Sequence, residues 1–397
     1  MNEAFVKAAP ILIEIEKAGY EAYFVGGSVR DFLLKKEIDD VDIATSATPE
    51  EIKSIFSKTI DVGIEHGTVV VLFQGASYEI TTFRAEAEYR DFRRPSEVAF
   101  IRSLKEDLQR RDFTMNAIAM DKEGQLFDPF NGQQAITEEE IVTVGEASER
   151  FQEDALRMMR AVRFMSQLSF NIENGTSQAL IEYGHLLEHI AVERKTVEFE
   201  KLLSGKNRLK AIELLIQTKL YQYLPGLSGY EKGLLELVSF DIRELDLNET
   251  WSIMIKVLGI HNVERFLKKW RLPTKQIRTI NKLTAKLEVR NQREWSREDL
   301  YETEWPEVAS VEKIFNVLNH RPTFSNIHEV EKKYREIPIK NRGELKVTGT
   351  DLMEWYNLKG GPWINDSLGK IEQAILSGKV SNEKERIREW LMRCNHN

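Results

Sequence analysis

The chain has 397 residues, of which 42% are hydrophobic and 30% are charged, and its formal net charge is −8. This composition predicts a soluble protein of two to four compact units, and the acidic balance argues against a general nucleic-acid binder. A single cysteine, Cys394, excludes an intrachain disulfide, and no apolar run approaches the roughly 20 residues of a membrane span. Because Glu3 and Glu14 make the N-terminus unlike a secretory signal, we expect a cytoplasmic protein.

The first distinctive pattern is an apolar run at 22–25 that leads into the segment GGSVRD at 26–31. It predicts a strand that ends in a glycine turn and opens into a helix at Ser28, with Asp31 three residues later as in a capping box. Glycines let the backbone approach a phosphate, and the free N–H groups of a helix start favour negative charge. The candidate phosphate-binding residues are therefore Gly26 and Gly27, although most such turns are only turns.

The segment DVDIAT at 40–45 places two carboxylates two positions apart. On a strand predicted at 40–44, the side chains of Asp40 and Asp42 would point to one face. Mg²⁺ usually takes one or two carboxylates plus substrate phosphates, so this pair is a candidate metal site. A phosphate-binding turn beside a metal pair indicates nucleotidyl transfer by two-metal catalysis, whereas a solvated strand end is the structural alternative.

Two more strands are predicted at 68–74 and 78–84, joined by the hairpin signal Gly75-Ala76-Ser77. On the second strand, Glu79 is either a third catalytic carboxylate, holding metal or activating the attacking hydroxyl, or a surface residue. The charged and aperiodic segment at 84–95 predicts a mobile loop. The polar residues that we single out in it are Arg84, Glu86, Arg90 and Asp91.

The segment RRDFTMNA at 110–117 is a compact polar cluster that opens a predicted helix. Arg111 could neutralise triphosphate charge, because a guanidinium matches phosphate oxygens in a fork. Asp112 and Asn116 could bind a ribose or orient the arginines. Ordinary surface ion pairs at a helix start are the alternative.

From about 150 onward, helical periodicity dominates and little strand signal remains. On the helix predicted at 150–168, Asp154 and Arg157 are three apart and would be neighbours, while Arg160 and Arg163 wrap around the helix. A carboxylate accepts from the amine of C or A but repels the carbonyl of U and G, so the pair could select C and A. Plain salt bridges are the alternative. The other predicted helices span 175–190, 194–204, 207–218, 229–238, 250–258, 262–270 and 274–289.

A basic block runs from Arg265 to Arg290, with nine Lys or Arg residues and a single acid, Glu288. Its helical segments flank Pro273. A basic face on an acidic protein could bind one particular nucleic acid, and a solvated helix face is equally compatible with the pattern.

Together these motifs resemble those of class II CCA-adding enzymes, bacterial tRNA nucleotidyltransferases of the polymerase-β-like superfamily. The resemblance is specific in order and spacing over the first 164 residues and continues in the segment at 347–364. The matching motifs are GGSVRD (26–31), DVDIAT (40–45), TTFR with the loop that follows (81–94), RRDFTMNA (110–117), FDPFNG (127–132), EDALRMMRAVRF (153–164) and VTGTDLMEWYNLKGGPWI (347–364).

The resemblance implies an α+β fold, with a polymerase-β-like head built on a mixed sheet and an elongated all-α neck, body and tail. The expected domains are the head (1–149), a nucleotide-selecting neck (150–206), a body (207–310) and a tRNA-binding tail (311–397). It also implies addition of C, C and A to the 3′ end of tRNA from CTP and ATP, release of pyrophosphate, Mg²⁺ as cofactor and a homodimer.

The resemblance also implies roles for the matched positions. Asp40 and Asp42 would bind the metal ions, Gly27 and Arg30 would lie on the triphosphate side, and Arg111 would contact the nucleotide. Asp154 and Arg157 would select C and A, with Arg160 and Arg163 completing the pocket, and the loop would serve the switch from C to A.

Three alternatives remain open at this point. Poly(A) polymerases and enzymes that add only CC or only A share these head motifs. A non-catalytic RNA-binding protein is opposed by the intact Asp40 and Asp42. A nucleotidyltransferase for small molecules or proteins is opposed by the long helical half.

Overall fold

The computed structural model describes residues 2–38, 40–63, 67–86, 89–90, 94–95 and 98–394. The chain forms two compact units. Unit 1 consists of Met1–Val238 with Lys269–Arg271, and unit 2 consists of Ser239–Lys268 with Leu272–Asn397. Within the described residues, no helix combines the length and the hydrophobicity that crossing a membrane requires.

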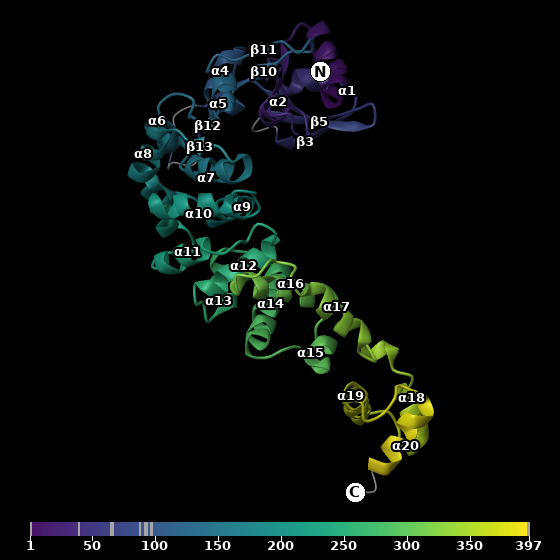
Figure 1. The fold of residues 1–397 in the computed structure, drawn as a ribbon. Helices are drawn as coiled ribbons and strands as arrows, with labels where there is room; N and C mark the ends of the chain where they lie inside the picture. The colour runs from purple at the N-terminus through teal and green to yellow at the C-terminus, as the bar shows by residue number, and fades with distance from the viewer. Residues whose placement is uncertain are drawn as a thin grey trace. The chain divides into compact units, whose positions relative to one another are not determined.

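A mixed sheet with its helices forms the first part of unit 1 (Figure 1). The sheet has seven strands in the order β11-β10-β1-β2-β5-β4-β3. β2 and β5 run parallel, and all other neighbours in this sheet run antiparallel. Its strands are β1 (Ala22–Val25), β2 (Asp42–Thr45), β3 (Thr59–Gly63), β4 (Thr68–Phe73), β5 (Ala76–Thr82), β10 (Ala119–Met120) and β11 (Leu126–Phe127). The mixed sheet expected for the head is confirmed.

One face of this sheet buries side chains of β1, β2, β4 and β5, and the other face is covered only in part. Phe5 of α1 packs on Phe24 with ring centroids 4.8 Å apart, and buried side chains of β2, β4 and β5 share that face. On the other face, Val25 and Ala44 pack with Leu104 and Leu108 of α4. The head helices are α1 (Glu3–Lys17), α2 (Gly27–Leu33), α3 (Pro49–Ile55), α4 (Leu104–Gln109), the 3-10 turn η2 (Thr114–Asn116) and α5 (Gly132–Thr137).

The glycine turn lies as predicted between β1 and α2, but its details differ. The helix begins at Gly27, and Gly26 is its N-cap with φ 71°. Ser28 donates its hydroxyl to the Val25 carbonyl at 2.9 Å, and Asp31 pairs with Arg30. The predicted capping box is therefore wrong, because both side chains have other partners.

The strand that carries the DxD motif begins later than predicted. β2 starts at Asp42, so Asp40 lies in the segment before it. The prediction of both carboxylates on one strand face is wrong for Asp40, because strand pairing with β1 begins only at Asp42.

The predicted hairpin is confirmed, with its turn one residue earlier. β4 and β5 are joined by Gln74 and Gly75, both with positive φ, as a two-residue hairpin turn requires. The segment predicted as an irregular loop contains short ladders: β6 (Arg84–Glu86) pairs with β9 (Val98–Phe100), and β7 (Tyr89–Arg90) pairs with β8 (Arg94–Pro95). Asp91 lies outside the described residues.

Helices make up the rest of unit 1, and α7 contacts both α9 and α10 (Figure 1). The one strand pair here, β12 (Glu140–Ile141) with β13 (Asn171–Ile172), is parallel and was not predicted on the helical side. The helices are α6 (Ala147–Glu153), α7 (Leu156–Leu168), α8 (Asn174–Tyr183), η3 (Gly184–His189), α9 (Val192–Leu203), α10 (Arg208–Gln217), η4 (Leu220–Tyr223) and α11 (Glu231–Val238).

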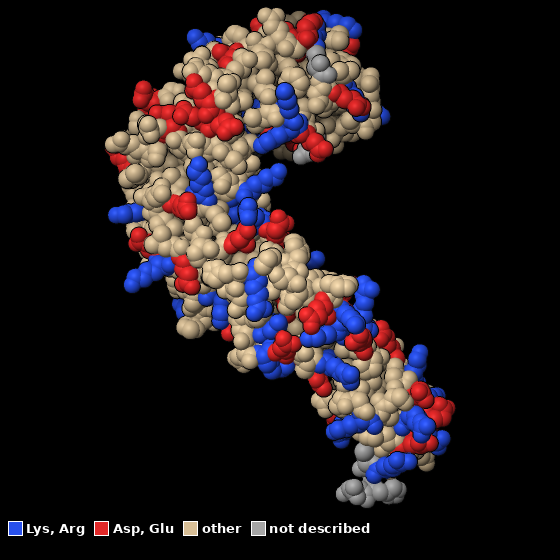
Figure 2. All heavy atoms as spheres, in the orientation of Figure 1, with Lys and Arg blue, Asp and Glu red and all other residues tan. Residues whose placement is uncertain are grey.

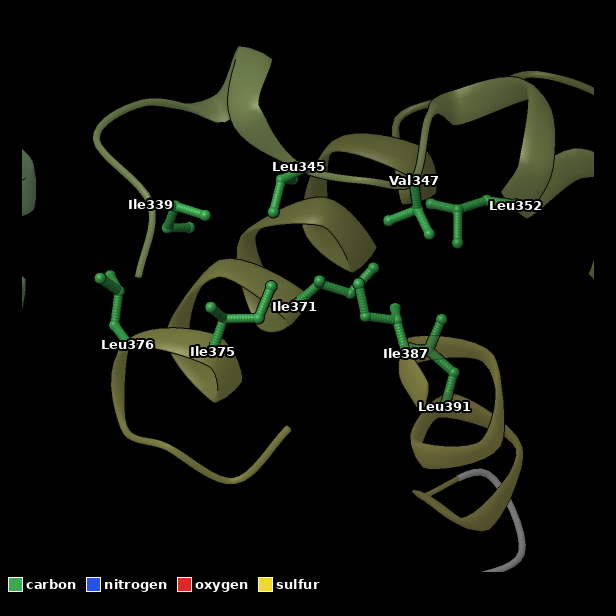
Figure 3. Close-up of a cluster of buried hydrophobic side chains, with 9 residues drawn as sticks. All are labelled: Ile339, Leu345, Val347, Leu352, Ile371, Ile375, Leu376, Ile387 and Leu391. Atoms are coloured by element: carbon green, nitrogen blue, oxygen red, sulfur yellow. The ribbon is translucent and has the colours of Figure 1, made fainter. Parts of the chain in front are cut away.

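Unit 2 is helical throughout its described residues, as predicted. Its last helices enclose a core of aliphatic side chains that includes Leu352, Ile371 and Ile387 (Figure 3). Pro273 precedes α14, and Lys282 and Arg290 of the basic block pair with Glu307 and Glu312. Its elements are α12 (Leu247–Val257), α13 (Val263–Lys269, which ends in unit 1), α14 (Thr274–Gln292), α15 (Arg297–Glu302), α16 (Trp305–Leu318), α17 (Ile327–Glu336), η5 (Arg342–Glu344), α18 (Gly349–Tyr356), α19 (Trp363–Leu376) and α20 (Lys384–Cys394).

Candidate active site

A cavity of about 670 Å³ in unit 1 collects most of the predicted site residues. Nine cationic and only three anionic side chains line it, so it is suited to a polyanion such as a triphosphate. Asp40 and Glu79 do not belong to its lining. The predicted residues that do are Gly26, Gly27, Arg30, Asp42, Arg84, Arg111, Asp112, Asn116, Asp154, Arg157, Arg160 and Arg163.

The basic lining of this cavity contrasts with an acidic patch on the surface. Acidic side chains gather over the region of α5 and α6 on the face drawn in Figure 2. That stretch of the chain exposes Glu138, Glu139, Glu146 and Glu149. An anionic ligand is therefore repelled by this surface and attracted by the cavity.

Gly26 is the point where the glycine turn, Arg111 and Asp42 meet. A Cβ added at Gly26 would lie 3.1 Å from Arg111 Nη1 and 3.5 Å from Asp42 Oδ2. Its φ of 71° also disfavours any side chain. Glycine is thus required both for the backbone turn and for the close approach of these two charged groups.

A chain of polar contacts links the helix start of α2 to α7. Arg30 Nη1 donates to Asn116 Oδ1 at 2.7 Å, and Asn116 Nδ2 donates to Asp112 Oδ1 at 3.1 Å. Asp112 Oδ2 accepts from Arg160 at 2.6 Å. Burial raises the pKa of Asp112, but the Arg160 charge and the hydrogen bonds outweigh it and lower the pKa to about 2. Asp112 and Asn116 therefore hold two arginines, Arg160 and Arg30, by hydrogen bonds.

Arg111 is held by a buried carboxylate, Asp107, that was not predicted. Arg111 Nη2 donates to Asp107 Oδ2 at 3.2 Å, and Arg110 pairs with Oδ1 at 2.8 Å. The backbone N–H of Arg84 also donates to Asp107, at 3.3 Å. Burial raises the pKa of Asp107, but the charges of both arginines lower it below its ordinary value. Asp107 is ionised and fixes the start of the charged segment at 84–95.

Phe164 carries three guanidinium groups around its ring. Those of Arg163, Arg30 and Arg160 lie 4.2, 5.2 and 5.5 Å from the ring centroid. Arg163 pairs with Glu198 at 2.8 Å, and burial lowers its pKa to about 10. The ring places three cations side by side without cancelling their charge.

The predicted arrangement of Asp154 and Arg157 on one helix is wrong. The helix is broken: Asp154 ends α6 in an extended conformation, and its carboxylate accepts from the backbone N–H of Leu156 at 3.0 Å. Asp154 pairs with Arg194 of α9 at 2.7 Å, and Arg157 donates to Glu153 and to the Arg110 carbonyl. Both residues still line the cavity, because the break turns Asp154 toward it.

Models of known families match three parts of the chain. "Poly A polymerase head domain" matches residues 22–142, "probable RNA and SrmB-binding site of polymerase A" matches 169–230, and "tRNA nucleotidyltransferase domain 2" matches 246–391. The chain is 49% identical over 395 residues to the CCA-adding enzyme of Bacillus cereus strain G9842, with 99% of each chain covered. It is 48% identical over the same length to that of Bacillus anthracis strain CDC 684.

The chain belongs to the CCA-adding enzymes.

Solved structures of CCA-adding enzymes share its fold. The Bacillus stearothermophilus CCA-adding enzyme in complex with CTP superposes with a TM-score of 0.91 at 45% identity, covering 100% of this chain and 98% of that one. The Thermotoga maritima CCA-adding enzyme complexed with tRNA superposes at 0.64 with 22% identity, covering 99% and 96%. The second likeness supports the fold alone.

CCA-adding enzymes, as nucleotidyltransferases, use a divalent metal ion, and the carboxylates on and beside β2 of this member fit one. The pKa of Asp42 is raised above its ordinary value. Desolvation is the largest cause, the Arg111 charge acts against it, and the charges of Glu79 and Asp40 add to it. Among the described residues, no three His, Cys, Asp or Glu side chains converge to hold a metal by themselves. A cation held by one or two of these carboxylates would therefore complete its coordination with water and substrate oxygens.

Sequence reasoning missed several residues of this CCA-adding enzyme's cavity. Arg194 and Lys201 come from α9, some 40 residues beyond the motif that they face. Only the tertiary fold brings them there. Asp107 lies three residues before a motif already noted, and an acid three and four residues before two arginines was a signal available in the sequence.

Proposed function

We propose that this CCA-adding enzyme adds C, C and A in turn to the 3′ end of tRNA without a nucleic-acid template, taking the nucleotides from CTP and ATP and releasing pyrophosphate. The observation that supports it most strongly is the cavity, which joins Asp42, a set of arginines and the pair Asp154 and Arg157. One cavity thereby offers groups for the reacting phosphate, for the triphosphate and for the base.

Arg30, Arg111, Arg160 and Arg163 bind and orient the triphosphate. The carboxylates of Asp112 and Asp107 keep two of them in place before substrate arrives, through contacts of 2.6 and 3.2 Å. Because the groups are fixed in advance, little reorganisation accompanies the reaction. In this proposal, Arg84, Glu86, Arg90 and Asp91 act in the switch from C to A.

Asp154 and Arg157 select the base. The carboxylate of Asp154 accepts from the amine of C or A and repels the carbonyl oxygen that U and G carry at the same place. Arg194 and the Leu156 N–H fix its orientation, and a carboxylate retains lone pairs beyond these bonds. Arg157, held by Glu153, donates to the ring nitrogen beside the amine.

The metal in this proposal is Mg²⁺, held by Asp40 and Asp42. When bound, it lowers the pKa of the attacking hydroxyl and stabilises the charge of the leaving oxygens. Glu79 lies beside Asp42 on the neighbouring strand, as the register Ile43↔Ile80 places it, and it orients the 3′-hydroxyl. The proposal also includes a cytoplasmic homodimer, with head 1–149, neck 150–206, body 207–310 and tRNA-binding tail 311–397.

The test is extension of tRNA transcripts that end just before CCA, after C and after CC. Each is incubated with Mg²⁺ and one nucleoside triphosphate at a time, beside an unstructured RNA. We expect two C and then one A, on tRNA only. A long A tract on any RNA would instead identify a poly(A) polymerase, and arrest at CC or addition of A alone would identify a partial enzyme. No extension would contradict the proposed activity.

A further inference from the structure

The partly open face of the head sheet carries an aliphatic row beside the carboxylates. Glu79 is the direct cross-strand partner of Val70, and Val70 is that of Ile60. Because cross-strand partners share a face, Asp42, Glu79, Val70 and Ile60 form one row across β2, β5, β4 and β3. At the strand spacing of about 4.8 Å, the row is roughly 14 Å long.

Two aliphatic residues on this face are exposed to solvent, and Val70 is half-buried. Ile60 is 49% and Leu72 is 43% exposed, and Leu72 lies two residues along β4 from Val70 on the same face. Single exposed aliphatic residues need no explanation, but here they lie on the same sheet face as two proposed catalytic carboxylates, on the strands next to them. We call Ile60, Val70 and Leu72 the aliphatic row.

The nucleotide cavity lies on the other side of Asp42. Its lining includes Asp42, Gly26 and Arg111, and neither Glu79 nor any member of the aliphatic row. In phosphoryl transfer, the attacking and leaving oxygens are roughly in line on opposite sides of the phosphorus. If the pyrophosphate leaves toward the arginines, the 3′-hydroxyl has to approach from the side of Glu79. The RNA end that carries it then lies over β5, β4 and β3.

We propose that the aliphatic row binds the 3′-terminal nucleosides of the RNA, an inference that rests on the proposed function. Aliphatic side chains pack against the faces of bases and the C–H groups of ribose, and they offer no hydrogen-bond donor or acceptor. They hold C and any other base alike. The enzyme needs this, because the terminal nucleoside changes after each addition while the site that reads the incoming base stays the same.

The test compares Leu72→Ser and Ile60→Ser with a matched control, Val6→Ser. Val6 is 56% exposed on α1, away from this face. We expect each row variant to raise KM for tRNA by about five- to tenfold, from the lost apolar contact, with equal effects on tRNA ending before CCA, after C and after CC. The affinity for CTP should not change, and Leu72→Met should restore KM.

A second readout reports contact directly. A tRNA ending in 4-thiouridine is irradiated on the wild-type enzyme, and the crosslinked peptide is identified. We expect crosslinks to β3, β4 or β5, which a merely structural role of these residues would not produce. Three results would overturn the proposed binding of the RNA end at the aliphatic row. They are an unchanged KM for tRNA in both row variants, an equal change in Val6→Ser, or crosslinks only to other parts of the chain.

The remaining outcomes separate this inference from the function on which it rests. If the row variants change the sedimentation coefficient and leave KM for tRNA unaltered, the row makes a contact between copies of the chain, and the proposed binding of the RNA end is wrong. If the wild-type enzyme adds CCA and the row variants behave as the wild type does, only the proposed binding of the RNA end at the aliphatic row is contradicted. If the wild-type enzyme does not extend tRNA at all, the proposed function itself fails.

Discussion

Asp42 and Asp112 line the same cavity, but the protein treats their charges in opposite ways. Asp112 is buried, accepts from Arg160, Asn116 and the Phe113 N–H, and has its pKa lowered to about 2. The pKa of Asp42 is raised, by desolvation and by the neighbouring carboxylates. The charge of Asp112 is satisfied within the protein, whereas that of Asp42 is left for a cation or a substrate to satisfy. Asp112 therefore helps to build the cavity, and we propose that Asp42 serves the reaction.

The largest expected effect comes from removing the charge of Asp42. Asp42→Asn should lower the rate of nucleotide addition by at least about a thousandfold, because the metal loses a charged ligand at the reacting phosphate. Rapid-quench measurement of CTP addition to tRNA checks this. The matched control is Asp61→Asn, an exposed carboxylate on β3 that pairs with Lys53. A rate within tenfold of the wild type in Asp42→Asn would contradict the role.

Asp112→Ala should damage the structure of the cavity rather than the chemistry. It leaves the Arg160 guanidinium without its buried partner, which we expect to cost about 3 kcal/mol in the free energy of unfolding. Urea denaturation measures this. In the control, Asp241→Ala, the pair with Arg243 is exposed, so little change is expected. Equal stability of the two variants would argue that Asp112 is not buried in an ion pair.

Acid should weaken the protein partly through Asp112. Its folded pKa of about 2 lies below its ordinary value of about 3.9, so ionised Asp112 stabilises the fold above that ordinary value. This contribution, about 2 kcal/mol, is lost as the pH falls from about 5 to 2. Urea unfolding of the wild type and of Asp112→Asn over this range should converge as the pH falls. Parallel curves would contradict the shifted pKa.

Asp154→Ala should affect the choice of base and leave the metal site intact. Without the carboxylate, the repulsion of the U carbonyl is lost, and we expect the preference for CTP over UTP to fall by about tenfold or more. Competition between CTP and UTP on tRNA measures the ratio. Glu149→Ala, which removes an exposed acid of α6, is the control. An unchanged preference for CTP over UTP would contradict the assignment of Asp154 as the residue that selects the base.

The smallest expected effect is a gain in stability. Because the folded pKa of Asp42 is raised, its ionised form destabilises the fold above that pKa, and this cost disappears when the carboxyl is protonated or replaced. Asp42→Asn should therefore raise Tm slightly at pH 7, while Asp112→Asn lowers it. A lower Tm in Asp42→Asn would show that both carboxylates serve the fold.

The local motifs of this chain predicted much of the site, because they are contiguous. The glycine turn at 26–31 and the hairpin at 68–84 form from neighbouring residues, so the sequence pattern suffices. The helix break at Asp154 was missed because apolar periodicity continues through it. Asp154 ends α6 and accepts a hydrogen bond from the first N–H of α7, and the preference of aspartate for such turns could have indicated the break. Arg194 could not be predicted, since 40 residues separate it from Asp154.

The division of labour between the two carboxylates is tested most directly by single-turnover CTP addition to one tRNA, comparing Asp42→Asn and Asp112→Ala over a range of CTP concentrations. We expect Asp42→Asn to bind CTP but to transfer it at least about a thousandfold more slowly than the wild type at every CTP concentration. Asp112→Ala should transfer CTP at saturating concentration and show weakened binding. Transfer by Asp42→Asn within tenfold of the wild-type rate at saturating CTP, or loss of transfer in a folded Asp112→Ala, would contradict this division.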